Sequence, residues 1–131
     1  MIGDDRDSKV FKHIGLEIDE SDLEDFYRDL LNLEIIGSGR IEKEMAEKLF
    51  GIPQSVDVRY AKGDGYELEL FICQNRLSPN FRHLCIHTDR AGNIYDLSLK
   101  KGYHAVIHEN RDRKSYFIKD RNGNTFELKS R

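Results

Sequence analysis

One strand pattern occurs twice in this chain. Residues 11–19, FKHIGLEID, align without gaps with residues 81–89, FRHLCIHTD, so that Phe, His and Asp recur at matched places. An internal repeat predicts two copies of one supersecondary unit. Because so small a unit cannot cover both faces of its own sheet, we expect the two copies to pack into one layered body.

The hydrophobic pattern predicts the same order of elements in both copies. In the first copy, alternation over residues 10–18 predicts a strand, and residues 19–31 combine capping side chains with helical spacing. Strands are then expected at 33–36, 56–61 and 66–73, with a turn at GSGR (37–40) and a short helix over 42–50. The second copy predicts a strand from His83, a helix over 91–101, and strands at 103–109, 114–119 and 124–129. Each copy is therefore a βαβββ unit, and the 42–50 helix, which has no counterpart in the second copy, is expected as a lid or a dimer contact.

The length of 131 residues fits one domain of class α+β. We expect a flexible N-terminus over 1–9 and a single domain over 10–131. Within it, module 1 covers about 10–74, a linker covers 75–80, and module 2 covers about 81–131.

Composition excludes several classes of partner. The formal net charge is -3, with basic residues scattered rather than grouped, so nucleic acid is not expected. No apolar run approaches the roughly 20 residues that cross a bilayer, and the N-terminal residues lack the apolar core of a signal peptide. A cytoplasmic protein without a membrane partner is expected. Cys73 and Cys85 have no CxxC spacing, which favours reduced thiols.

The alternation of side chains along the strands predicts that four side chains able to bind a metal ion lie close together. If the apolar residues of each strand pack under the helices, the alternate residues point the other way. A two-fold relation between the copies would then bring together His13, Glu69, His83 and Glu127. Two imidazoles and two carboxylates suit a divalent metal ion with open positions for substrate. The alternative is that each is a solvated residue of a half-exposed sheet, but recurrence at matched places favours the metal site.

The same parity indicates candidates for the lining of a substrate cleft. These are Glu17, His87, Tyr60 and Phe71, for which a solvated or core position is the alternative. His104 and His108 also share a face, but their surroundings predict an exposed edge strand.

Several segments resemble the vicinal oxygen chelate superfamily, the group of glyoxalase I, bleomycin-resistance proteins and extradiol dioxygenases. They are FKHIGLEID, FRHLCIHTD, ESDLEDFYRDLLNLEII, YELELF and SYFIKDRNGNTFELK, and the resemblance covers about residues 9–129. It implies two βαβββ modules that form an open, cleft-like half barrel of mixed sheet, commonly in a homodimer. It also implies one divalent metal ion per site, whether Zn, Ni, Co, Mn or Fe, held by His13, Glu69, His83 and Glu127.

A ligand set with two carboxylates resembles that of glyoxalase I, a lactoylglutathione lyase. It implies a metal-dependent lyase or isomerase in which a glutamate removes a proton next to a carbonyl to form an enediolate. Glu127 is expected to be both a metal ligand and the catalytic base, and Glu69 is the second candidate for the base. Glutathione-using relatives carry Arg and Asn where this chain has Glu17 and Cys73, so the small-molecule substrate and its thiol stay open. The alternatives are a metal-free, ligand-sequestering protein of the bleomycin-resistance type and, less favoured, an extradiol dioxygenase.

Overall fold

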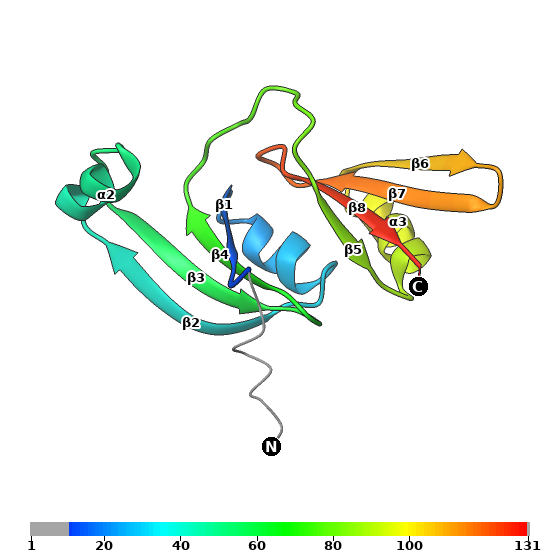
Figure 1. Cartoon of the computed structure of the whole chain (residues 1–131), viewed down its shortest axis with the longest axis horizontal. Coiled ribbons are helices and arrows are strands. Elements are labelled where there is room, and N and C mark those ends of the chain that lie inside the picture. The colour runs from blue at the N-terminus through cyan, green and yellow to red at the C-terminus, as the bar shows by residue number, and fades with distance from the viewer. Residues whose placement is uncertain (1–10, 131) are drawn as a thin grey trace, which may run out of the picture.

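The computed structural model describes residues 11–130 and contains two copies of the predicted unit (Figure 1). The first copy comprises β1 (Ile14–Ile18), η1 (Leu23–Arg28), β2 (Glu34–Ile41), α2 (Lys43–Phe50), β3 (Val56–Lys62) and β4 (Glu67–Ile72). The second comprises β5 (Leu84–His87), α3 (Ala91–Lys100), β6 (His104–Asn110), β7 (Arg113–Lys119) and β8 (Thr125–Lys129). The predicted order of elements is confirmed, with α2 only in the first copy. The expectation for residues 1–9 lies outside the described residues.

Each copy forms its own four-stranded mixed sheet. The strand orders are β1-β4-β3-β2 in the first sheet and β5-β8-β7-β6 in the second. In both sheets the first strand pairs in parallel with the last, and the other pairings are antiparallel. Neither sheet closes into a barrel, so the α+β class and the open, mixed-sheet architecture are confirmed. Within residues 11–130, no helix is long and apolar enough to cross a membrane.

The two sheets share one hydrophobic core. Ile18, Leu68 and Leu70 of the first sheet and Phe126 and Leu128 of the second are almost completely buried, as are the η1 aromatics. The ring of Phe126 lies 5.6 Å from that of Phe26 and 5.9 Å from that of Tyr27, measured between centroids. The η1 segment therefore packs against both copies, and burial of its aromatic rings joins them into one body.

Two buried tyrosine–aspartate hydrogen bonds cross between the copies. The Tyr27 hydroxyl donates to Asp120 Oδ2 at 2.6 Å, and the Tyr103 hydroxyl donates to Asp22 Oδ1 at 2.7 Å. Each copy thus supplies one phenol and one carboxylate. Burial, followed by the nearby charge of Asp120, holds the pKa of Tyr27 well above its usual range, so this phenol remains a donor.

The Asp22 and Asp120 carboxylates accept further hydrogen bonds from the turn between β7 and β8. Asp22 accepts from the backbone N–H of Arg121 at 2.7 Å and pairs with its guanidinium. Asp120 accepts from both the backbone and the side chain of Asn124, at 2.8 Å each. The buried acids are therefore well supplied with donors, as a polar group in a core must be.

The first predicted helix is shorter and wider than its sequence pattern indicated. Backbone bonds of the i to i+5 type run from Asp29 N–H to the Glu24 carbonyl and from Leu31 N–H to the Phe26 carbonyl, at 3.0 and 3.1 Å. The regular part covers only Leu23–Arg28 and has π-helical geometry. Consecutive core residues accompany this difference, because Phe26 and Tyr27 are neighbours in the chain and both are fully buried in the shared core.

The predicted turn at GSGR is wrong. β2 runs without a break from Glu34 to Ile41, with a bulge between Ile35 and Gly37. The ring of Tyr60 on the adjacent strand lies over the glycines: a Cβ on Gly39 would stand 3.0 Å from the Tyr60 hydroxyl, and one on Gly37 would stand 3.2 Å from the ring. These glycines therefore make room for an aromatic ring within a strand and do not form a turn.

Removal of the Tyr27 hydroxyl should weaken the joint between the copies. Tyr27→Phe deprives the buried Asp120 carboxylate of a donor, so we expect the free energy of unfolding to fall by about 1.5–3 kcal/mol. Urea denaturation followed by circular dichroism measures this change. Tyr95→Phe is the matched control, because the Tyr95 ring packs on Tyr116 within module 2, and a loss below about 0.5 kcal/mol is expected there. Equal losses in both variants would contradict a special role for the Tyr27 bond.

Candidate functional site

The structure places a histidine next to a glutamate in each copy. His13 directly precedes β1, Glu69 lies on β4, and the Nε2 of His13 is 3.3 Å from Glu69 Oε2. His83 directly precedes β5, Glu127 lies on β8, and the Nε2 of His83 is 3.4 Å from Glu127 Oε1. The parallel pairing of first and last strand makes this contact in both sheets, with Gly15 opposite Glu69 and Cys85 opposite Glu127. We call these two His–Glu pairs the half-sites.

The half-sites do not merge within one chain. Among residues 11–130, no three His, Cys, Asp or Glu side chains come close enough together to hold one metal ion. Each half-site sits on its own sheet, on the face turned away from the shared core, which we call the open face. The four predicted ligands are therefore grouped as two and two.

The tautomer of His83 shows what its half-site can accept. The Nδ1 atom lies 2.9 Å from the carbonyl oxygen of Phe81. A carbonyl only accepts hydrogen bonds, so Nδ1 carries a proton and Nε2 is the ring nitrogen that faces Glu127. The Nε2 atom lies 3.4 Å from Glu127 Oε1, so the two groups can bind one cation together when Nε2 carries no proton. A nitrogen and a carboxylate oxygen with the second ring nitrogen held by the backbone suit a divalent transition metal, so the residues fit this group.

The surroundings of the second half-site are basic. The hollow next to His83 is lined by Arg82, His104, Lys119 and Phe117. Lys129 adds an ammonium 3.5 Å from Glu127 Oε2. This open face therefore favours an anionic group near the half-site.

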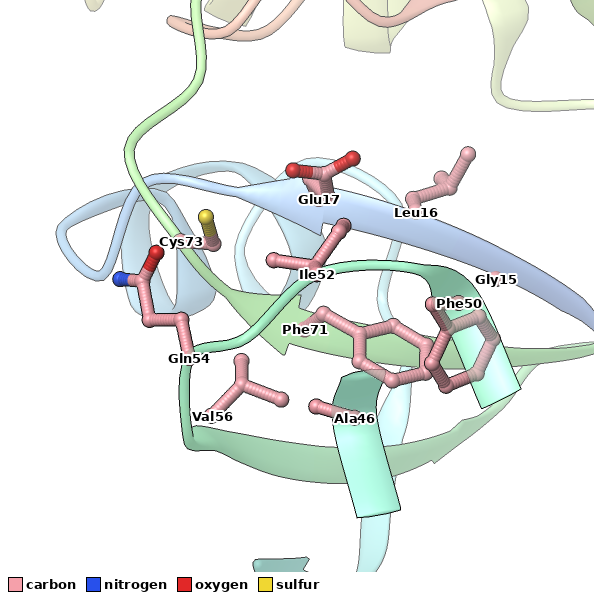
Figure 2. A pocket seen from close by; sticks show the side chains of 10 residues that line it. All are labelled: Gly15, Leu16, Glu17, Ala46, Phe50, Ile52, Gln54, Val56, Phe71 and Cys73. Atoms are coloured by element: carbon pink, nitrogen blue, oxygen red, sulfur yellow. The ribbon is translucent and has the colours of Figure 1, made fainter. Parts of the chain in front are cut away.

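The first half-site adjoins an apolar pocket of about 210 Å³ beneath α2 (Figure 2). Its walls include the rings of Phe50 and Phe71, which meet edge to face with centroids 5.7 Å apart. Glu17 also lines it, so two of the four predicted cleft residues lie here. Sequence reasoning missed the contributions of Phe50, Ile52 and Cys73. The 42–50 segment, predicted as a lid or dimer contact, was a signal for Phe50, and Cys73 has the same strand parity as the predicted Phe71.

The remaining candidates occupy other places. Tyr60 stands opposite Glu69 in the β3–β4 ladder and is 38% exposed, so it borders the first half-site. His87 lies four residues beyond His83, about 13 Å along an extended strand, and lines a hollow with Tyr66 and Arg90 between the copies. His104 and His108 are exposed on the edge strand β6, as predicted. Cys73 and Cys85 are free thiols, also as predicted.

Comparison with solved structures finds the same fold in fosfomycin-resistance and glyoxalase-family proteins. FosX from Listeria monocytogenes, complexed with Mn(II) and sulfate, is 15% identical, with a TM-score of 0.67 over 92% of this chain and 91% of that one. A variant of the same FosX, complexed with Mn(II) and 1S,2S-dihydroxypropylphosphonic acid, is 16% identical, with a TM-score of 0.69 over 91% and 90%. A glyoxalase family protein from Enterococcus faecalis is 18% identical, with a TM-score of 0.65 over 92% and 96%. No protein-family model and no curated protein sequence matches the chain.

The hydrogen bond to Phe81 makes a spectroscopic prediction for His83. At a pH of about 8, where free histidines are neutral, we expect His83 to hold its proton on Nδ1, whereas His108 on the exposed edge strand should show the mixture of tautomers of a solvated ring. Long-range 1H–15N correlation spectra of the metal-free protein distinguish the two nitrogens. A proton on Nε2 of His83 would contradict the assignment.

Proposed function

We propose that this chain, which has the fold of the vicinal oxygen chelate superfamily, is a divalent-metal-dependent isomerase or lyase of the glyoxalase I type. The observation that carries the proposal is the repeated half-site, in which an imidazole nitrogen faces a carboxylate oxygen at 3.3 Å in one copy and 3.4 Å in the other. Joined, the half-sites supply two nitrogen and two oxygen ligands. Such a set leaves coordination positions open for a substrate.

A homodimer would complete the metal site. Because the half-sites lie on separate sheets, His13 and Glu69 of one protomer are proposed to meet His83 and Glu127 of its partner. Two-fold symmetry then generates two identical sites per dimer. Exposed apolar side chains on the open faces support such a contact, since Tyr60 and Val106 are 38% and 47% exposed. A partner sheet would remove this apolar area from water.

The proposed roles of the residues follow from their positions. When bound, the metal ion would act as a Lewis acid on the substrate carbonyl. Glu127 is the proposed base that takes the proton from the adjacent carbon, and Glu69 is the second carboxylate. The Glu127 side chain is the more enclosed, 14% exposed against 26% for Glu69, and Lys129 holds its Oε2. A positioned, largely dehydrated carboxylate suits proton transfer.

A second candidate is the addition of water to a small anionic epoxide. The basic hollow beside His83 favours it, because Arg82 and Lys119 would match a phosphonate there. The likeness to FosX, including the variant that holds a dihydroxypropylphosphonic acid, points in the same direction. In that reaction the oxygen of water bonds to one epoxide carbon, the C–O bond at that carbon breaks, and the proton of water reaches the released oxygen to give a diol.

Metal analysis tests the shared site. After incubation with Ni, Co, Zn, Mn or Fe salts and dialysis, we expect about one ion per chain, lost in His13→Ala and in His83→Ala, because each site would lose a ligand. The control His108→Ala should retain the ion.

Co-expression of His13→Ala with His83→Ala then locates the site. A mixed dimer would contain one site with both histidines intact and one with neither, so metal binding should partly return. If each chain held its own complete site, no mixture would restore binding. If wild-type protein bound no ion, a metal-free, ligand-sequestering protein would replace the enzyme proposal.

Turnover tests the proposed base. Glu127→Gln removes the proton acceptor, so we expect proton-transfer turnover of hemithioacetals or acyl thioesters to fall by at least about 10²-fold. Circular dichroism should show an unchanged fold. The control is Glu109→Gln on the edge strand β6, where the carboxylate pairs with the exposed Lys114. Equal activity of Glu127→Gln and wild type would exclude Glu127 as the base. If the wild-type protein turned over an epoxide phosphonate but neither hemithioacetals nor acyl thioesters, the second candidate would be favoured.

A further inference from the structure

The pocket beneath α2 adjoins the first half-site. Gly15 lies in the pocket wall and stands opposite Glu69 in the β1–β4 ladder. Phe71 follows Glu69 by two residues on the same face of β4, which is about 7 Å along a strand. The absence of a side chain at Gly15 keeps this route open, because a Cβ there would stand 3.1 Å from the Phe71 ring. A small molecule held at the half-site can therefore extend into the pocket.

The pocket presents apolar surface that the chain itself leaves partly uncovered. Ala46 is 2% exposed and anchors α2 to the sheet, whereas Phe50 and Ile52 at the mouth remain 55% and 47% exposed. Figure 2 shows the rings of Phe50 and Phe71 side by side, with Ile52 above Phe71. The volume of about 210 Å³ exceeds that of a cavity of about 150 Å³, which is known to hold benzene.

The polar end of the pocket is acidic. Glu17 is the one charged side chain in its lining, and its Oε1 accepts a hydrogen bond from the Asn75 side chain at 3.0 Å. Burial, reinforced by Glu17, raises the pKa of the neighbouring Cys73 thiol, so that this thiol keeps its proton. No Lys or Arg lines the pocket within the described residues. A carboxylate on a ligand would therefore meet Glu17 without a compensating cation, at a cost in binding.

We infer, resting on the proposed function, that this pocket binds the apolar substituent of a neutral or cationic α-hydroxy carbonyl substrate. The substituent is of phenyl or branched-alkyl size and lies between Phe50 and Phe71, with the carbonyl end at His13 and Glu69. Glu17 discriminates against anionic substrates such as a tripeptide thiol conjugate. The α2 helix is thus a specificity element, and it occurs once per chain because module 2 lacks it.

Ligand titration of the metal-free protein tests the pocket by itself. The probes are neutral 2-hydroxyacetophenone and its 4-carboxylate, added in the presence of a chelator and followed by 1H–15N correlation spectra. We expect the neutral probe to give saturable shifts at Phe50, Ile52 and Phe71 and to bind about tenfold more tightly than the carboxylate. In Glu17→Gln this preference should shrink to less than about threefold, because the repulsion is removed.

Two further variants separate pocket binding from surface binding. Ala46→Phe fills the pocket, and Phe50→Ala removes an exposed wall with little risk to folding. Each substitution should weaken the binding of the neutral probe about tenfold, which corresponds to the loss of one aromatic contact. The control Leu99→Ala removes an exposed apolar side chain from α3, outside the pocket and both half-sites, and should leave affinity unchanged.

An absence of saturable shifts at the pocket would overturn the inference, as would equal affinities for both probes in wild-type protein. Because the chelator removes metal from every sample, these results are independent of the proposed function. That function fails instead if wild-type protein binds no ion or turns over no substrate.

Discussion

The burial of η1 between the two sheets is the interaction on which the rest of the structure depends. Its aromatic rings fill the space between the copies, with Phe26 and Tyr27 both in contact with Phe126. The bonds from Tyr27 to Asp120 and from Tyr103 to Asp22 then fix the orientation of one copy relative to the other. Because η1, α3 and the core occupy the inner faces, the histidines and glutamates are directed to the open faces. The same packing that stabilises the monomer keeps its half-sites apart.

Repetition and asymmetry have separate consequences in this chain. The parallel contact between first and last strand is made twice, and it produces the same His–Glu pair twice. The surroundings of the two half-sites differ. The first half-site adjoins an apolar pocket with Glu17 at one end, and the second lies near Arg82 and Lys119. In the proposed dimer, one site would combine both environments. A substrate with an apolar end and a polar reacting end fits such a combination.

The extra residues between β2 and β3 have the largest effect on this asymmetry. Module 2 joins the corresponding strands, β6 and β7, by a short turn, whereas module 1 inserts α2 and the segment with Ile52 and Gln54. The insertion covers one end of the open face with apolar side chains. Ala46 is buried against the sheet, and Phe50 reaches across to Phe71. One short insertion thus turns a flat sheet face into a pocket.

The sequence by itself determined the order of elements in two modules and the facing of His13, Glu69, His83 and Glu127 away from the apolar layer. Both follow from local rules, because alternation along a strand sets the facing of each residue and the repeat sets the order of strands. The sequence misled at GSGR, where glycines normally indicate a turn, since the Tyr60 ring that requires them comes from a strand far along the chain. Only the tertiary structure decided that the four ligands lie in two separate groups and that Phe50, Ile52 and Cys73 share a pocket with Glu17. These features depend on how whole sheets and α2 pack on one another, and packing between distant segments leaves no periodic signal in the chain.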